Sequence, residues 1–205
     1  MASDIGRPRK ASNSTDTKKR LTRAAAELIS SGGIQAVTVR NVVRRSGLST
    51  GTFYHHFANK DDLLMYFVKT ESFCDKKLKS PIKNISDRII ELYMCLIDRY
   101  KELGLDFMKC FYTTDNKALC AYMGEETGEF LPDTVMFRCE EEIKKAIAAG
   151  ILKPETDAHL ISRDICTIVK GCVFEWCLSD GGTDLCKCMK RILKNYFVPL
   201  THRTV

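Results

Sequence analysis

The chain has 205 residues, of which 44% are hydrophobic and 28% are charged. This balance is that of an ordinary globular protein and argues against a wholly disordered or fibrous chain. The sequence contains no uncharged apolar run of about 18 residues, so no membrane span is predicted. The net charge of +6 is uneven: residues 1–60 hold 11 Lys or Arg and 3 Asp or Glu, a balance of +8, whereas residues 61–205 hold 21 and 23, a balance of −2. The sequence therefore predicts a polyanion-binding N-terminal part on a near-neutral body.

All ten cysteines lie in that body, between Cys74 and Cys188. The N-terminus is polar and basic and lacks the apolar core of a secretory signal, so we expect a cytoplasmic location with reduced thiols that mostly serve as small buried hydrophobic groups. The close pair Cys186 and Cys188 lacks the spacing of a zinc motif. We expect no cofactor and no metal. A redox or metal sensor that uses Cys186 and Cys188, or another set of thiols, remains the alternative to packing.

Residues 1–16 are polar and basic and predict a flexible arm. Its string Gly6–Lys10 resembles Arg-rich arms that enter an A·T-rich minor groove, and a simple electrostatic tether is the alternative. From Thr17 to Ser30, apolar residues recur at helical spacing, and the glycine pair that follows ends this helix.

Four helices, with a tight turn between the second and the third, are predicted over residues 17–65, and the first is the helix from Thr17. Thr38 caps the second helix, Gly47 makes the turn, a third helix capped by Ser49 or Thr50 runs through Phe57, and Asn59 caps a fourth helix. Three short helices with a tight turn between the second and the third form a helix-turn-helix.

In a helix-turn-helix, the third helix lies in the DNA major groove and its first residues meet the base edges. The small, polar or aromatic side chains in that position here are Ser49, Thr50, Gly51, Thr52, Tyr54, His55 and His56. Basic residues suited to the phosphate backbone are Arg40, Arg44, Arg45 and Lys60. Phe53 and Phe57 lie four residues apart and are predicted to be core.

The pattern Gly-Leu-Ser-x-Gly-x-Phe-Tyr-x-His-Phe-x-x-Lys, which begins at Gly47, resembles the TetR family of bacterial transcriptional regulators. The resemblance covers about residues 17–65 and implies a dimeric DNA-binding regulator, most often a repressor. It further implies that Thr38 contacts phosphate and that Arg40 reaches a base or phosphate. The same resemblance places Thr50 and Thr52 at the floor or edge of the groove, Tyr54 and His55 on phosphate or base, and His56 and Lys60 on the backbone. A packing role beneath the turn is the alternative for His56.

Residues 66–205 continue as helices without a convincing strand pattern. The predicted segments are Ser86–Leu103, Leu105–Tyr112, Asp115–Met123, Thr134–Ala149, Asp157–Leu178 and a last helix from Thr183 or Asp184 to Phe197. The sequence thus predicts an all-α protein of about nine helices, in which residues 66–205 form a ligand-binding and dimerisation domain.

The last two helices are the candidates for a homodimer interface, because their apolar surface is wider than one core-facing stripe requires. Gly171 would allow close approach of a second helix. The predicted interface residues are Ile161, Ile165, Ile168, Cys172, Leu185, Met189 and Ile192. A twofold dimer would read a palindromic double-stranded DNA operator. The alternative is that both helices only cover their own core.

The middle helices are expected to enclose a cavity for a mostly apolar small-molecule effector. Aromatic or adaptable residues that could line it are Tyr93, Tyr100, Phe107, Phe111, Tyr112, Met123, Phe137 and Trp176. Each of these is also an ordinary core residue. Ligand binding would weaken DNA binding through different affinities for two states.

Catalysis is not expected. His159 has Asp157 and Asp164 nearby in sequence, but no nucleophile or phosphate-binding loop accompanies it. A nonregulatory, architectural role in DNA binding is least expected, because it would assign no function to most of the chain.

Overall fold

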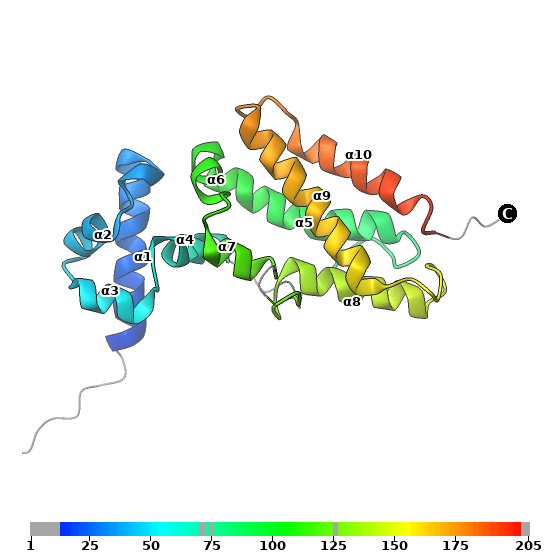
Figure 1. The fold of residues 1–205 in the computed structure, drawn as a ribbon, viewed down its shortest axis with the longest axis horizontal. Coiled ribbons are helices and arrows are strands. Elements are labelled where there is room, and N and C mark those ends of the chain that lie inside the picture. Colours follow the sequence, from blue (N-terminus) through cyan, green and yellow to red (C-terminus); the bar gives the residue numbers. More distant parts are fainter. Residues whose placement is uncertain (1–12, 70–72, 74–75, 125–126, 202–205) are drawn as a thin grey trace, which may run out of the picture. The chain divides into compact units, whose positions relative to one another are not determined.

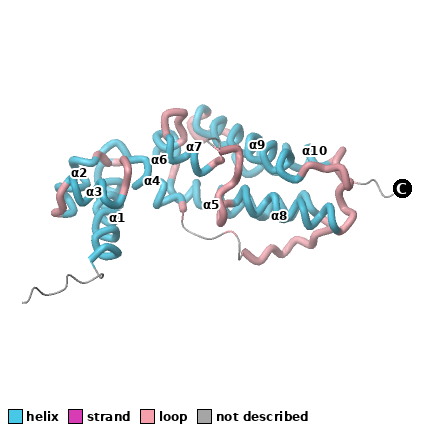
Figure 2. Tube along the Cα trace, turned by 60° about the horizontal axis from the view of Figure 1, so that its bottom comes forward, coloured by secondary structure: helices cyan, strands magenta, loops and turns pink. Residues whose placement is uncertain are grey.

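A computed structural model describes residues 13–69, 73, 76–124 and 127–201. These residues form ten α-helices, one short 3₁₀ helix and one isolated bridge between Leu152 and Thr201, which confirms the predicted all-α fold (Figures 1 and 2). Tertiary contacts divide the chain into two compact units, residues 1–66 and 67–205. None of the described helices is long and apolar enough to cross a membrane.

The first unit contains three helices and most of a fourth. These are α1 (Asn13–Gly32), α2 (Val39–Ser46), α3 (Thr50–His56) and α4 (Lys60–Val68), with the 3₁₀ helix Ile34–Ala36 between α1 and α2. The core of this unit is built from one face of α1 together with α2, α3 and α4, and its buried members include Leu21, Ala25, Leu28, Val42, Phe53, Phe57 and Leu63. Phe53 and Phe57 are therefore core, as predicted.

Helix α1 begins earlier than predicted, at Asn13, so the last four residues of the proposed arm 1–16 are helical. Asp16 lies in the first turn, where its carboxylate favours the positive end of the helix dipole. Polar residues that are poor in a helix interior are well placed in such a first turn. Residues 1–12, including the basic string Gly6–Lys10, lie outside the described residues.

The second unit contains α5 (Ile85–Leu103), α6 (Leu105–Phe111), α7 (Lys117–Tyr122), α8 (Val135–Ala148), α9 (Ala158–Leu178) and α10 (Leu185–Phe197). Helices α5, α8, α9 and α10 pack on one another, and α6 joins α5 and α9 (Figure 1). Thr134, Asp157 and Asp184 cap α8, α9 and α10 through hydrogen bonds from backbone N–H groups. The long, apolar helices thus enclose one core.

A buried ion cluster ties α5 to α8 in this unit. The Glu142 side chain is 0% exposed and accepts from Arg88 at 2.5 Å, Arg138 at 2.9 Å and Lys145 at 3.0 Å. Burial alone would raise the pKa of Glu142, but the hydrogen bonds from Arg88 and Lys145 and the nearby guanidinium groups lower it. Arg88 also donates to the Ser80 carbonyl at 2.6 Å, so the chain entering α5 is held by the same cluster.

Candidate functional site

The turn between α2 and α3 is set by Gly47, whose φ of 66° and ψ of 26° are left-handed. Glycine adopts this conformation without the steric cost that a side chain would add. Arg20 of α1 donates to the Ser46 carbonyl at 2.8 Å. The turn is therefore fixed both by its own glycine and by a contact to α1.

Hydroxyl caps begin both helices of the motif. The Asn41 N–H donates to Thr38 Oγ1 at 3.1 Å, and the Thr52 N–H donates to Ser49 Oγ at 3.0 Å. Ser49 Oγ and Thr52 Oγ1 are also hydrogen-bonded at 2.8 Å. A cap oxygen that accepts from the backbone keeps its own proton, which leaves Thr38 able to donate to a phosphate.

The predicted DNA-contacting residues lie at the surface of this unit. Thr52, His56 and Lys60 are half-buried, and the others, which are Thr38, Arg40, Arg44, Ser49, Thr50, Gly51, Tyr54 and His55, are exposed. The Tyr54 ring is 56% exposed and packs edge-on against Phe53 at 5.4 Å, which aims its hydroxyl away from the core. Within the described part of the chain, the side chains of Arg40, Thr50 and Lys60 have no hydrogen bond or ion pair. Their donors are available to an external acceptor.

Two other arginines of α2 are partly occupied. Arg44 donates to Asn41 Oδ1 at 3.2 Å, and Arg45 lies 3.7 Å from a carboxylate oxygen of Glu27 on α1. The Arg45 contact was not predicted, because Glu27 is distant in sequence. Arg45 is therefore a weaker candidate for phosphate binding than Arg40.

His56 combines packing with a polar edge. Its ring is half-buried and lies edge-on to His55 at 5.1 Å. Burial lowers the pKa of His56, and the positive charges of His55 and Lys18 lower it further. The lowered pKa favours the neutral ring, so His56 would act as a hydrogen-bonding group.

Two adjoining cavities in the second unit include four of the eight predicted ligand residues. An open groove of 810 Å³ is lined by Tyr112 and Met123 together with Leu119, Thr167, Lys170, Gly171 and Phe174, among others. Behind it, a closed gap with no room for a water molecule is lined by Tyr93, Tyr100, Tyr112 and Met123. The threonines and lysines of the groove were not anticipated, because their sequence positions look like ordinary solvent-exposed helix and loop positions.

The other four predicted ligand residues line neither of these cavities. Phe107 and Phe111 are buried and stack at 5.6 Å, as expected for core residues. Phe137 and Trp176 are half-buried. The structure places these four residues at neither cavity, and a ligand-binding role for them stays a prediction, because an aromatic side chain at helical spacing fits a core equally well.

The predicted dimer residues lie mostly inside the protomer. Ile161, Ile165, Cys172, Leu185 and Met189 are each less than a tenth exposed, and Ile168 and Ile192 are half-buried. They pack between α9, α10 and the neighbouring helices, so they cannot supply most of an external contact. The exposed apolar side chains of α9 are instead Leu160, Phe174 and Leu178, which are 55%, 54% and 66% exposed.

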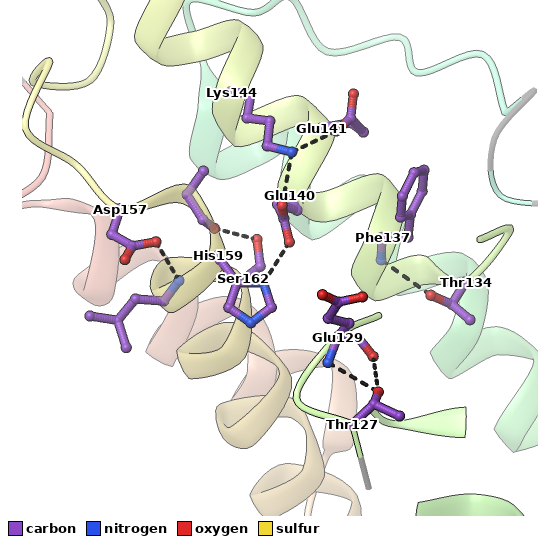
Figure 3. A network of polar contacts seen from close by, with 12 residues as sticks. Thr127, Glu129, Thr134, Phe137, Glu140, Glu141, Lys144, Asp157, His159 and Ser162 are labelled. Atoms are coloured by element: carbon purple, nitrogen blue, oxygen red, sulfur yellow. Dashed lines mark hydrogen bonds and ion pairs between the residues drawn. The ribbon is translucent and has the colours of Figure 1, made fainter. Parts of the chain in front are cut away.

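The region around His159 is a structural polar network (Figure 3). His159 Nδ1 lies 2.8 Å from Glu140 Oε2, and Lys144 contacts the same carboxylate at 2.8 Å. The Ser162 hydroxyl donates to the Ala158 carbonyl at 2.8 Å and not to the histidine. The network therefore joins α8 to α9.

The described cysteines are free thiols with varied exposure. Cys186 and Cys188 are half-exposed, and the Cys188 sulfur lies 4.0 Å from that of Cys172 on α9. Burial raises the pKa of Cys139 to about 12 and raises that of Cys172 as well, which keeps both thiols protonated. Among the described residues, no cluster of three or more His, Cys, Asp or Glu side chains could hold a metal.

Residues 21–66 match the family model for bacterial regulatory proteins of the tetR family. The repressor KstR2 of Mycolicibacterium smegmatis is 22% identical over 162 residues, which are 71% of this chain and 72% of that protein. The regulator PksA of Bacillus subtilis is 30% identical over 71 residues, which are 35% of this chain and 33% of that protein. Such relatives are DNA-binding regulators rather than enzymes.

Solved structures share the fold along most of the chain. FadR of Thermus thermophilus, a TetR-family repressor solved with lauroyl-CoA, has a TM-score of 0.61 at 16% identity and covers 92% of this chain and 97% of its own. SmeT, the repressor of a multidrug efflux pump of Stenotrophomonas maltophilia, has a TM-score of 0.56 at 18% identity, with 92% and 94% covered. The motif, the fold and the family match agree: residues 21–66 match the tetR family model, and the fold along most of the chain is similar to that of TetR-family structures.

Proposed function

We propose that this protein is a homodimeric repressor that binds a palindromic operator and releases it when a small, mostly apolar molecule occupies the second unit. The observation that carries the DNA-binding part is the set of unoccupied donors in the first unit, above all the exposed Arg40 and Thr50 and the half-buried Lys60. Arginine and lysine supply the phosphate contacts, and small polar side chains at the start of α3 allow a close approach to base edges.

The same assignment covers all residues of the predicted DNA surface. Thr38, Arg40, Arg44, His56 and Lys60 would bind the backbone, while Ser49, Thr50, Gly51, Thr52, Tyr54 and His55 would face the groove. The Ser49 hydroxyl already caps α3 and is hydrogen-bonded to the Thr52 hydroxyl. The hydrogen bonds that these two residues could make to a base would therefore depend on which of the two hydroxyls donates to the other. Arg40 would contribute more than Arg44, whose guanidinium is partly engaged by Asn41.

The dimer would form through an outer stripe of α9, defined as Leu160, Thr167, Gly171, Phe174 and Leu178. These exposed residues recur at intervals of seven, four, three and four, which keeps them on one helix face. Thr167, Gly171 and Phe174 also line the 810 Å³ groove, so the effector groove would lie at the edge of this interface. Gly171 supports this choice, because a Cβ added there meets no atom within 4 Å. A helical glycine costs about 1 kcal/mol relative to alanine, and the protomer shows no internal contact that requires it.

The effector would enter the 810 Å³ groove beside α9. FadR of Thermus thermophilus, which shares the fold, was solved with lauroyl-CoA, which supports an effector with a long apolar part. A redox response at Cys139 or Cys172 is less well supported, because both thiols are held protonated, and a metal response is less well supported, because the described residues offer no metal cluster.

Selection of bound sites from random duplexes tests the proposal. We expect two inverted half-sites whose centres are about one helical turn of DNA, or a multiple, apart. A single half-site bound by a monomer would contradict the dimer, and sequence-independent binding would contradict an operator. Addition of compounds that raise the melting temperature should then lower affinity for the selected site; unchanged affinity with all of them would contradict effector-induced release.

A further inference from the structure

The open groove and the closed gap of the second unit share part of their walls. Tyr112, Met123 and Lys170 line both, so the gap lies directly behind the groove. Met123 is 6% exposed and carries an unbranched, flexible side chain. A rotation of this side chain would connect the two spaces, and a molecule seated in the groove could then extend into the gap.

One tyrosine hydroxyl at the gap, that of Tyr100, has no hydrogen bond. Tyr100 is 0% exposed, and its hydroxyl has no hydrogen-bond partner among the residues that the structure describes. The hydroxyl of Tyr93, which is 1% exposed, has the Cys139 thiol beside it, a weak hydrogen-bonding group. Burial raises the pKa of both tyrosines far above the usual range, so both keep the proton that a hydrogen bond to an acceptor requires.

Water cannot supply the missing acceptor, because the gap has no room for a water molecule. A buried hydroxyl without a partner destabilises a protein, and phenylalanine would fill the same volume without this cost. The hydroxyl of Tyr100 is therefore best explained by a state in which the gap is occupied. This reasoning does not apply to Tyr122, which is also buried but lines neither cavity.

The chemistry of the walls restricts the occupant. Apart from the tyrosines, the gap is lined by Leu96, Met123, Met136, Cys166, Val169 and Lys170. No acidic side chain is present on this wall, so a cationic group would lack a counter-ion there. Lys170 lines both the gap and the open groove, whereas Tyr93 and Tyr100 line only the gap. Their hydroxyls are neutral hydrogen-bond donors. Neutral donors in an apolar wall suit an uncharged acceptor.

We propose that the effector is an uncharged, largely apolar molecule with a carbonyl oxygen, which displaces Met123 and accepts a hydrogen bond from Tyr100. This assignment rests on the proposed effector-released function and adds the chemical class of the effector. The apolar body lies along Tyr112, Leu119 and Phe174 in the groove, and the carbonyl reaches the gap.

The test uses benzophenone and diphenylmethane, which differ by a carbonyl group in place of a methylene, with the full chain and its Tyr100→Phe and Tyr122→Phe variants. Benzophenone should bind the unaltered protein about tenfold more tightly than diphenylmethane, the effect of one satisfied hydrogen bond. Tyr100→Phe should raise the melting temperature of the ligand-free protein and remove this preference. Tyr122→Phe should keep it. Irradiation of bound benzophenone should attach it to the peptide that contains Met123.

Several results would overturn the proposal. A lower melting temperature for Tyr100→Phe would show that the hydroxyl already has a partner in the resting protein. Equal binding of the two probes, or no benzophenone binding up to its solubility limit, would contradict the proposal that the effector carries a carbonyl group. Tighter binding of 4-benzoylbenzoate than of benzophenone would assign an anion instead. Operator binding by the ligand-free protein is measured separately, and its loss would contradict the proposed function whatever the probes show.

Discussion

Lys60 begins α4 with a half-buried side chain that has no ion pair among the described residues. We expect Lys60→Ala to weaken binding by a similar factor for different operator sequences and to reduce the salt slope by about one unit, because a phosphate contact carries no base information. Titration of labelled duplexes at several salt concentrations measures both quantities. Lys153→Ala, at an exposed position of the second unit, is the control and should change neither. An altered base preference in Lys60→Ala would show that Lys60 contacts a base.

Glu142 provides a second prediction at this scale, because its carboxylate is fully buried among three basic groups. Glu142→Gln should lower the free energy of unfolding by about 3 kcal/mol, since Arg88 and Arg138 would keep their charges without a partner. Chemical denaturation followed by the fluorescence of Trp176 measures this change. A loss within about 0.5 kcal/mol would show that the cluster is not a stabilising contact.

The pH dependence of stability follows from the same carboxylate. Its pKa in the folded protein lies below the ordinary value of 4.5, so its contribution is complete above that value and declines as the pH falls through the folded pKa. The unaltered protein should therefore lose stability on acidification more steeply than Glu142→Gln. Parallel denaturation curves between pH 3 and pH 6, roughly the range in which carboxylates titrate, distinguish the two. Equal slopes would contradict the lowered pKa.

The caps and the turn that place the candidate DNA-contacting residues could be predicted because these residues lie close together in sequence, whereas their contacts with DNA stay a prediction. Thr38, Ser49 and the residues of α3 are placed by local caps and one turn, and their exposure follows from the helix face that Phe53 and Phe57 bury. The pairing of Glu142 with Arg88 joins residues 54 positions apart. No local pattern signals such a contact, because acidic residues at helical spacing usually face water.

At the scale of elements, capping residues and glycines marked most helix boundaries to within a few residues. The predicted helix Asp157–Leu178 is α9, Ala158–Leu178, with Asp157 as its cap. What could not be predicted is which faces of α9 are covered. Apolar residues surround this helix, and periodicity alone does not distinguish a side packed against α8 or α10 from a side open to a partner. The predicted interface therefore consisted mainly of core residues.

The outer stripe of α9 leads to a prediction about assembly. Leu178→Glu places a charge on a side chain that is 66% exposed in the protomer, so the fold should tolerate it, whereas a dimer would bury that charge. We expect a monomer in light scattering and a large loss of operator affinity. Leu131→Glu, at an exposed apolar side chain in the loop before α8, is the matched control and should remain dimeric. A dimeric Leu178→Glu would move the interface elsewhere.

At the scale of the whole molecule, the division into a basic unit and a near-neutral unit separates two kinds of information in the sequence. DNA recognition uses a short motif whose geometry is local, and residues 21–66 match a family model. The proposed effector site is formed by side chains from α5, α6, α7, α8 and α9 that only the tertiary fold brings together. For this reason the sequence could suggest tyrosines at a cavity but could not indicate which hydroxyls lack a partner.

The uneven charge also leads to a prediction for the whole chain. Residues 1–12 contain Arg7, Arg9 and Lys10 and no more than one acidic residue, Asp4, and the described helix α1 begins after them. Deleting residues 1–12 should leave the melting temperature unchanged but weaken operator binding, and the salt slope should fall by about 0.9 for each lost phosphate contact. Replacing the three basic residues by Gln in the full-length chain should reproduce the loss if the arm acts by charge alone. If the deletion lowers affinity for A·T-rich flanks more than for G·C-rich flanks, the arm reads the minor groove, where a narrow A·T-rich tract concentrates negative potential. An unchanged salt slope would contradict any contribution of residues 1–12 to DNA binding.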